Sequence, residues 1–267
     1  MIDRVAPNEE RRLIRRSVAL LIAIGMIILV TGWAANGWKK SVGVKDIHVS
    51  GARILPAKDI VTLADVDRSQ KLFDVDVNAI RRRIEASPYV ESAAITRDIP
   101  GIVTIAVHER VPVVAVIGAK TVYLDDSARV LPPVKTTQIF DLPVLTGAVP
   151  SDECVAGKRI HAAPVLRALA LLDTARTFGD DLYHRISEVH INDDGSLICY
   201  TAESGIPIAF GQGGFALKLA KLDGFWKEFV VREGAPALEY VDLRFDDIVV
   251  ARWNQRQELA MHERENP

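Results

Sequence analysis

The sequence has few cysteines, and the two that it has, Cys154 and Cys199, belong to no spacing motif. Two cysteines in 267 residues exclude a disulfide-rich scaffold and a four-cysteine zinc site. A single disulfide between them and two separate, partly buried thiols are both compatible with the sequence. The fold is therefore expected to depend on a hydrophobic core.

The sequence also lacks an excess of positive charge. Its formal net charge is -2, its pI is near 6.3, and lysine and arginine are scattered along most of its length. Binding to a phosphate backbone requires a basic stripe or patch, so nucleic acid is not a predicted partner. The short arginine run Arg81–Arg83 is interpreted as the solvated face of a helix.

Motifs for catalysis and ligand binding are missing as well. The six histidines are dispersed, and neither H-E-x-x-H nor G-x-S-x-G occurs. The aspartates between 65 and 76 lack the glycine and the terminal glutamate of a calcium loop, and the glycine-rich segment 211–214 lacks the lysine of a phosphate loop. The pair Asp125-Asp126 is interpreted as part of a turn. We expect no catalytic residue, cofactor, metal ion or small-molecule substrate.

An uncharged run of 18 residues, Val18–Ala35, stands near the start of the chain. As a helix it would be about 27 Å long. The hydrocarbon core of a membrane is about 30 Å thick. Because apolar side chains occupy the whole circumference, the run predicts a transmembrane helix, which we place at 17–36.

The flanking charges predict the orientation of this helix. Arginines precede it at positions 4, 11, 12, 15 and 16, whereas fewer cations follow it. By the positive-inside rule, residues 1–16 form a cytoplasmic head and the rest of the chain lies on the outer side. A cleaved signal peptide is the alternative, since Gly32 and Ala34 are small, although an h-region usually has about 7 to 15 residues.

Residues 43–111 are predicted to form a first domain beyond the membrane. A β-leaning run ends at Ser50-Gly51, and two helices follow, the second capped by Asp76. Two strands, Val90–Arg97 and Ile102–Glu109, are joined by a tight turn. The predicted order is strand, helix, helix, strand, strand.

Residues 112–253 predict a larger second domain with an antiparallel sheet and flanking helices, which makes the chain α+β. Short strands are expected at 113–117, 121–124, 130–131, 186–191, 197–201 and 206–210, with a proline-rich irregular connection at 132–150. Helices are expected at 162–178 and 215–231, the second burying Leu219, Leu222, Trp226 and Phe229. A last strand should run from Tyr240 to Trp253, and residues 254–267 should form a mobile tail.

Two segments carry a resemblance to a known family. The stretch Ser87–Val116, SPYVESAAITRDIPGIVTIAVHERVPVVAV, looks like the end of a polypeptide-transport-associated (POTRA) domain. Its Pro88-Tyr89-Val90, Arg97, Pro100 and Glu109-Arg110 resemble the pattern of the FtsQ/DivIB family of cell-division proteins. The block Tyr240–Asp246, YVDLRFD, and the later Trp253 are similar to the segment that ends the β domain of that family.

The resemblance covers nearly the whole chain and implies a scaffold of the bacterial divisome that is not an enzyme. Such a protein crosses the inner membrane once at the division septum and links cytoplasmic with periplasmic division proteins. The implied partners are bitopic proteins of the FtsB and FtsL type and, through them, the septal peptidoglycan synthase pair FtsW and FtsI.

Two other functions are compatible with parts of the sequence. A POTRA-containing component of an outer-membrane assembly or secretion system needs a β-barrel, and the second domain is too short and too broken by helices to supply one. An anchored envelope hydrolase needs a catalytic constellation. His184 and His190, near Asp180-Asp181, would have to assemble one in space.

The resemblance implies that the FtsB-type partner extends the sheet at the terminal strand. Matched residue by residue, the partner-binding positions that the resemblance implies correspond to Phe245, Asp247 and Trp253. The full expected contact set is Tyr240, Leu243, Phe245, Asp247, Ile248, Val249, Val250 and Trp253. The alternative is an ordinary core strand, because the β-branched residues at 248–250 also suit a strand that is buried on both faces.

A second docking edge is expected in the first domain. We favour the strand 90–97 as an exposed edge, with Val90, Ser92, Ala94 and Thr96 as its contact residues. An unpaired strand presents N–H and C=O groups that another chain can satisfy.

Overall fold

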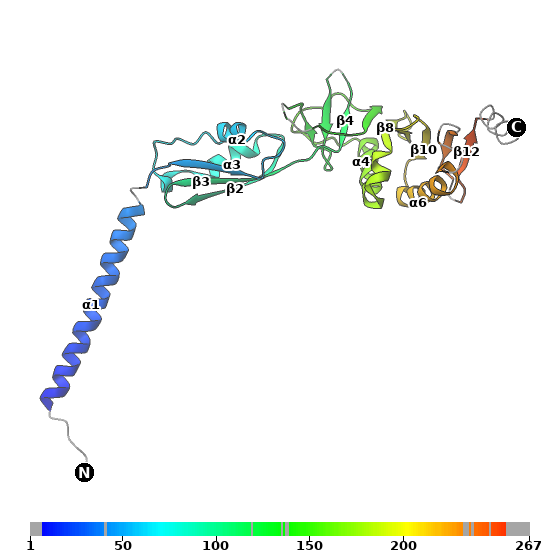
Figure 1. Cartoon of the computed structure of the whole chain (residues 1–267). Helices are drawn as coiled ribbons and strands as arrows, with labels where there is room; N and C mark the ends of the chain where they lie inside the picture. The colour runs from blue at the N-terminus through cyan, green and yellow to red at the C-terminus, as the bar shows by residue number, and fades with distance from the viewer. Residues whose placement is uncertain are drawn as a thin grey trace, which may run out of the picture. The chain divides into compact units, whose positions relative to one another are not determined.

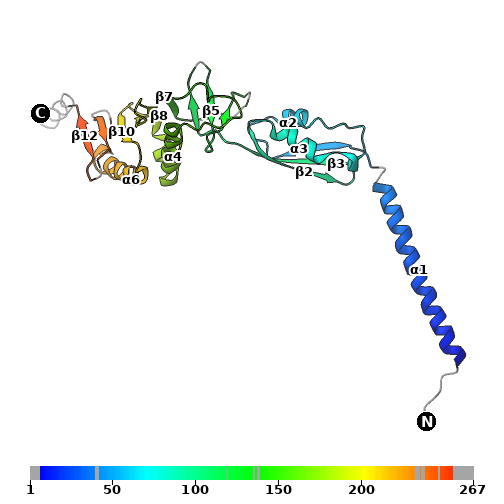
Figure 2. The same ribbon diagram turned by 180° about the vertical axis from the view of Figure 1, so that it is seen from behind.

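The fold is taken from a computed structural model of the chain (Figures 1 and 2). The structure describes residues 7–39, 42–118, 120–134, 136, 139–231, 235, 238–245 and 247–254, and within the first helix it describes the side chains of 17–33. The expected tail at 254–267 lies outside these residues except for Asn254. Of the expected head at 1–16, only the backbone of 7–16 is described.

The expected apolar helix is present as α1 (Pro7–Lys39), a continuous helix of 33 residues. Its polar Thr31 donates a hydrogen bond back to the carbonyl of Ile27 at 2.7 Å, which satisfies the hydroxyl within the helix. Among the described residues, which in α1 include side chains only for 17–33, no helix has the length and apolar character that crossing a membrane requires.

The chain forms two compact units. The first comprises residues 1–50, 57–83 and 93–106, and the second comprises 51–56, 84–92 and 107–267.

A three-stranded sheet with the order β1-β3-β2 runs through the first unit. Strand β1 pairs parallel to β3, from Asp46 opposite Ile102 to Ser50 opposite Ala106. The predicted order of strand, helix, helix, strand, strand is confirmed. The elements are β1 (Asp46–Ser50), α2 (Ala57–Ala64), the 3-10 turn η1 (Leu72–Asp74), α3 (Val77–Glu85), β2 (Val90–Asp98) and β3 (Ile102–Glu109).

Local polar contacts set the helix ends of this unit. The carboxylate of Asp76 accepts the N–H groups of Asn78 and Ala79, both at 3.0 Å, so the predicted N-cap of α3 is confirmed. These bonds, that from Ala79 foremost, lower the pKa of Asp76. The guanidinium of Arg83 donates to the carbonyl of Ala64 at 3.1 Å and thereby satisfies the C-terminal end of α2.

The second unit contains a nine-stranded sheet with the order β12-β11-β10-β9-β8-β7-β4-β5-β6. Its strands are β4 (Val114–Val116), β5 (Val122–Leu124), β6 (Val130–Leu131), β7 (Val144–Gly147), β8 (Ile186–Ile191), β9 (Leu197–Thr201), β10 (Pro207–Gly211), β11 (Leu238–Asp242) and β12 (Val250–Trp253). Its helices are α4 (Ala163–Phe178), α5 (Asp180–His184), α6 (Phe215–Phe225) and the π turn η2 (Trp226–Val230).

The expectation of an antiparallel sheet is wrong, because the sheet is mixed. Strand β7 runs parallel to both β4 and β8, and β10 runs parallel to β11. Parallel neighbours need a long crossover, which α4 supplies between β7 and β8, and α6 with η2 supplies between β10 and β11. Strand β7 itself lies inside the segment 132–150 that was expected to be irregular.

The glycine of β7 shows why that short strand can stand in the middle of the sheet. Gly147 has a φ of +83°, and a Cβ on it would lie 2.1 Å from the carbonyl oxygen of Ile191. Only glycine allows the two backbones to approach so closely.

Helices α4 and α6 lie on the same side of the sheet in both views (Figures 1 and 2) and cover the hydrophobic core of the second unit. The burial of Leu219, Leu222 and Trp226 is confirmed, but Phe229 is exposed and Val230 is buried in its place. A π turn advances more residues per turn than an α-helix, so η2 moves the buried position by one residue.

Both cysteines are free thiols in the structure. Cys199 lies on β9 within the core, and burial raises the pKa of its thiol. Of the two alternatives left open by the sequence, the structure has the separate thiols.

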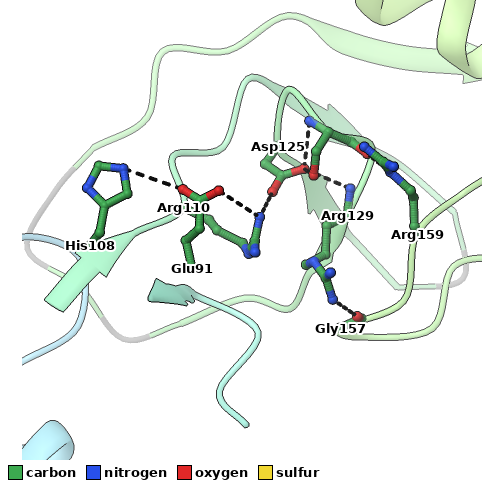
Figure 3. A network of polar contacts seen from close by, with 8 residues as sticks. Glu91, His108, Arg110, Asp125, Arg129, Gly157 and Arg159 are labelled. Carbon is green, nitrogen blue, oxygen red and sulfur yellow. Dashed lines mark hydrogen bonds and ion pairs between the residues drawn. The ribbon is translucent and has the colours of Figure 1, made fainter. Parts of the chain in front are cut away.

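A polar network holds the beginning of the second unit together. Figure 3 shows the guanidinium of Arg110 between the carboxylates of Glu91 and Asp125, at 3.9 and 3.0 Å. Asp125 is buried, and its other oxygen accepts the N–H groups of Ser127 and Arg129. The predicted turn at this point is therefore confirmed, and Asp125 serves as its anchor.

Glu109 supports the same unit with a second buried carboxylate. It accepts the backbone N–H groups of Arg53, Ile54 and Leu55 at 2.7, 2.7 and 2.9 Å. Three N–H groups that would otherwise be unsatisfied inside the protein are thus paired, which explains a buried glutamate at the end of an apolar strand.

Candidate functional site at the open sheet edge

The two outer strands of the nine-stranded sheet differ in how they end it. On the outer side of β6, Val130 donates to the carbonyl of Lys158 and accepts from the N–H of Gly157, both at 2.8 Å. That edge is short, buried and covered by the chain itself. At the other end, β12 pairs only with β11 among the described residues. Within the described part of the chain, the sheet therefore has one open edge, which is β12.

Asp242 is the polar centre of this region. Its buried carboxylate accepts the hydroxyl of Tyr240 at 3.0 Å, the backbone N–H of Arg244 at 2.9 Å, and the guanidinium of Arg244 at 2.6 to 3.1 Å. Hydrogen bonds from the Arg244 side chain foremost lower the pKa of Asp242 despite its burial. Asp242 is therefore ionised and holds its neighbours on both sides.

This pairing corrects the expected single strand from Tyr240 to Trp253. Strand β11 ends at Asp242, the chain continues through Leu243, and β12 returns antiparallel with Val250 opposite Asp242. Leu243 is fully buried, and its N–H donates to the carbonyl of Ala209 at 2.9 Å. The terminal block is a hairpin. Where the chain leaves β11, it is held by the polar contacts of Asp242 and by the buried side chain of Leu243.

The expected contact residues separate into two groups. Phe245, Ile248 and Val250 are 50%, 56% and 40% exposed, and Asp247 is exposed beside them. Leu243 is a core residue, while Tyr240, Val249 and Trp253 are partly buried. The exposure of Ile248 and Val250 contradicts the alternative of a strand buried on both faces.

Aromatic side chains support β12 from the helix side. Trp253 packs against the core, with its ring centroid 6.3 Å from that of Phe225, and Phe225 stacks on Phe229 at 5.5 Å. The contact between Trp253 and Phe225 adds apolar area to the edge strand, and Phe229 supports Phe225 from the other side. Trp253 thus contributes to the stability of the hairpin as well as to its surface.

The sequence pattern did not identify two lysines of α6 that lie near this edge. The turn 211–214 is a plain turn, as expected, and the ammonium of Lys218 closes it by donating to the carbonyl of Phe210 at 2.7 Å. Lys221 follows one helical turn later and lines a pocket with Phe245. Lysines on a helix are so common that no sequence signal singles these out.

The strand favoured in the first domain is also an edge. Strand β2 is the outer strand of the order β1-β3-β2. Ser92, Ala94 and Thr96 are exposed along it, whereas the side chain of Val90 is buried. Strand β1 forms the other edge of this sheet.

Two protein-family models match successive parts of the chain. Residues 42–110 match the family model described as POTRA domain, FtsQ-type, and residues 115–244 match the one described as cell division protein FtsQ/DivIB, C-terminal. The matched range thus ends at Arg244, and β12 follows it.

Curated relatives match over most of the chain. A cell division protein FtsQ of Rhodothermus marinus is 31% identical over 90% of this chain and 88% of its own length. A cell division protein FtsQ of Geobacter sp. (strain M21) is 29% identical over 92% and 93%, and one of Geotalea daltonii is 26% identical over 90% and 88%.

Replacing Asp242 with asparagine is expected to lower the free energy of unfolding by about 1 to 3 kcal/mol at neutral pH, because charge-assisted hydrogen bonds to a buried acceptor are lost. The pKa of Asp242 is lowered in the folded state, so its contribution is complete above the unfolded value near 4. It is lost as the pH falls through the folded pKa. Denaturant unfolding of both proteins should therefore show a difference that shrinks below about pH 4. The control is Asp247→Asn, at an exposed position, and a difference independent of pH would contradict the ion pair.

Proposed function

The chain belongs to the FtsQ/DivIB family of cell-division proteins, and on this premise we propose that it binds an FtsB-type partner by accepting a strand at β12. Its role is that of a scaffold in cell division, which works through protein–protein interactions. The relatives are named for cell division, so this role is favoured over outer-membrane assembly or secretion. We propose that it works by binding alone, without catalysis, together with FtsL-type partners and, through them, the synthase pair FtsW and FtsI.

The observation that carries the proposal is the open edge of the nine-stranded sheet. Strand β12 has its inner side paired with β11, and Val250 and Arg252 are exposed along it. An extended segment of another chain can pair with the free side and gain main-chain hydrogen bonds. The opposite edge, β6, is covered by residues 157–158 and does not offer this possibility.

Side chains next to β12 supply the apolar contacts that such a segment would need. Phe245 and Ile248 are large, apolar and half exposed or more, and both lie in the loop that leads into the strand. Aromatic side chains, phenylalanine included, are enriched at protein–protein interfaces. Phe245 is therefore proposed as the main anchor, with Ile248, Val250 and Asp247 around it.

Phe245→Ala is expected to weaken binding of the purified FtsB-type partner at least about 30-fold in titration calorimetry, equivalent to about 2 kcal/mol for a lost hot spot. The melting temperature should stay nearly constant, because half of the ring is already exposed. Phe178→Ala, at the end of α4, is the matched control, since Phe178 is 47% exposed and lies away from the edge strand. Equal binding by the wild type and Phe245→Ala would contradict the proposed anchor.

Trp253→Ala should reduce binding, as Phe245→Ala does, but it should also lower the stability of the free protein. The ring of Trp253 packs against the core and against Phe225, so its removal costs packing in the free protein. The difference between the two variants separates an exposed anchor from a residue that also supports the strand.

We also propose that α1 anchors the chain in the inner membrane at the septum, with its N-terminus in the cytoplasm. The proposal is supported by the uncharged run Val18–Ala35 and by the excess of arginine before it. In this proposal the parts of the chain have the bounds expected from the sequence: a head at 1–16, an anchor at 17–36, a POTRA domain at 43–111, a β domain at 112–253 and a tail at 254–267.

Protease added to spheroplasts that express the chain is expected to digest the domains beyond the anchor and to leave a small protected N-terminal fragment. The positive charges before the run hold that end in the cytoplasm. A mature chain that begins near Ala35 would show cleavage of a signal peptide and would overturn the anchor.

Strand β2 is proposed as a second docking edge, for a division protein other than the one that binds β12. It is nine residues long, stands at the edge of its sheet, and exposes Ser92, Ala94 and Thr96. Its backbone, including that of Val90, would pair with the added strand.

Ala94→Lys is expected to lower recruitment to the septum, because a lysine on an edge strand discourages pairing with another chain. The fold should be retained, since Ala94 is exposed. Fluorescence microscopy of tagged chains measures recruitment, with Thr62→Lys on the exposed face of α2 as the control. Normal recruitment of Ala94→Lys would argue against a docking role for β2.

A further inference from the structure

The packed part of the first unit begins a short distance after α1. Helix α1 ends at Lys39, and Val42 is already buried, with its carbonyl accepting the N–H of Leu72 at 2.8 Å. Three residues of chain span at most about 11 Å. The end of the unit that receives Val42 is therefore tied close to the end of α1, whatever the angle between the two.

Three segments of the chain meet at this end of the unit. Gly43 forms an antiparallel bridge with Lys71, and the N–H of Lys45 donates to the carbonyl of Gly101 at 2.7 Å. The turn that joins β2 to β3 is thereby held against the residues that follow α1. We call this end of the unit the proximal end; it consists of 42–45, 70–72 and the turn 98–101.

The turn 98–101 carries an exposed apolar side chain. Ile99 is 48% exposed, and Pro100 beside it is exposed as well. A single exposed apolar residue is ordinary on a surface that faces water. Ile99 differs because the short connection from α1 brings it within reach of any membrane that α1 crosses.

Two lysines lie on either side of the same turn. Lys45 and Lys71 are both exposed, and the methylene groups of Lys45 lie next to Gly101. A lysine lays its methylene groups along apolar surface and keeps its ammonium in a polar layer. Such side chains suit the boundary between acyl chains and lipid phosphates.

Two carboxylates at the proximal end are bonded back toward the strands. Asp98 accepts the hydroxyls of Thr96 and Thr104 at 3.2 and 2.6 Å, and both threonines lie farther along the strands than the turn. Asp46 accepts the backbone N–H of Ile47 at 2.8 Å. Local donors therefore satisfy these carboxylates in part, and that of Asp98 is directed away from Ile99.

We propose that the turn 98–101 docks on the surface of the membrane that holds α1, with Ile99 among the lipid headgroups and Lys45 and Lys71 on lipid phosphates. This inference rests on the proposed anchor and adds a second contact with the same membrane. One apolar side chain and two lysines bind a free vesicle weakly. The short connection to α1 gives the turn a high effective concentration at the surface, so that even a weak contact is populated.

Docking of the turn would also set the direction of β2. Strand β2 ends at Asp98, directly before Ile99, so its last residue would be held at the membrane and Val90 would lie farthest from it. A partner strand that pairs with β2 would then have one end at the membrane surface. The proposed second docking edge therefore suits a partner that has a membrane span of its own.

The test measures whether position 99 of the full-length chain lies at the membrane. In a Cys154→Ser background, Ile99→Cys is labelled with the fluorophore NBD, since the remaining Cys199 is buried. The chain is reconstituted in nanodiscs of phosphatidylcholine and phosphatidylglycerol, with and without lipids that carry a quenching spin label at the headgroup. We expect the quencher to remove at least about half of the emission of the label.

Val111→Cys, labelled in the same background, is the matched control. Val111 is apolar and 58% exposed, but it lies beyond the other end of β3, a strand of eight residues that is about 26 Å long. A label at 111 should therefore show almost no quenching. Equal quenching at 99 and 111 would overturn the proposal, because the fluorophore itself would then decide the result.

Lys45→Glu and Lys71→Glu, each with the label at 99, test the two lysines. Each change should lower the quenching about twofold, because a carboxylate then faces the lipid phosphates. Lys58→Glu, at the exposed start of α2, is the control and should leave the quenching unchanged. The melting temperature of each variant shows that it is folded. Unchanged quenching in both lysine variants would overturn the proposed contact with phosphates.

Co-elution of the chain with the nanodiscs separates this proposal from the one on which it rests. If the chain co-elutes but the label at 99 is not quenched, the docked turn is wrong and the anchor stands. If the full-length chain does not co-elute with nanodiscs, the anchor fails and the docked turn fails with it.

Discussion

The open edge of the nine-stranded sheet depends on the buried carboxylate of Asp242. A carboxylate that is removed from water needs full pairing, and Tyr240 and Arg244 provide it within a few residues of sequence. The backbone N–H of Arg244 also donates to the Asp242 carboxylate, at 2.9 Å, and this local bond turns the chain away from the strand. Strand β11 ends there, Leu243 enters the core, and Phe245 is directed to the surface. The Asp242 carboxylate thus fixes the point at which the chain leaves β11 and the exposed loop begins.

The two ends of the sheet limit unwanted pairing with other chains in different ways. An unpaired strand invites association with any other chain, and proteins limit this by short edge strands, bulges and charges. Strand β12 has four residues, the register of its pairing with β11 is irregular between Leu238 and Tyr240, and Arg252 is exposed along it. At β6 the edge is covered by the chain itself, whereas at β12 the edge is open and only its short length, its irregular register and the exposed Arg252 limit pairing with other chains.

Periodicity and turn chemistry were sufficient to predict most elements. Strands β6, β8 and β9 have the predicted bounds, and α4 begins one residue from its predicted start. Alternating apolar residues predict strands, and apolar residues at helical spacing predict helices. The parallel pairing of β10 with β11 could have been predicted too, because a helix is the usual connection between parallel neighbours and α6 was placed correctly. The parallel pairs of β7 could not, because β7 itself was not predicted.

Other features had no signal within their own segment. Strand β7 is only four residues long, lies in a proline-rich segment and is stabilised by neighbours far away in sequence. The end of β11 at Asp242 depends on a side-chain pair, and the burial of Val230 in place of Phe229 depends on a π turn. The pocket with Lys221 joins a helix to a loop that follows it by more than 20 residues. Such features belong to tertiary packing, which a linear pattern does not encode.

The length of β12 limits what backbone pairing can contribute to binding. In a four-residue strand, alternate residues face outward, so about four main-chain hydrogen bonds are available to an added strand. At about 1 kcal/mol net each, they contribute about 4 kcal/mol. Association itself costs about 4 kcal/mol or more, so pairing alone would give almost no affinity. Micromolar binding requires about 8 kcal/mol of net free energy. The strand can therefore set the direction and register of a partner, but the affinity must come from side chains beside it. Phe245 and Ile248 are large apolar residues exposed in the loop next to the strand, so covering them would remove apolar surface from water and supply the missing affinity.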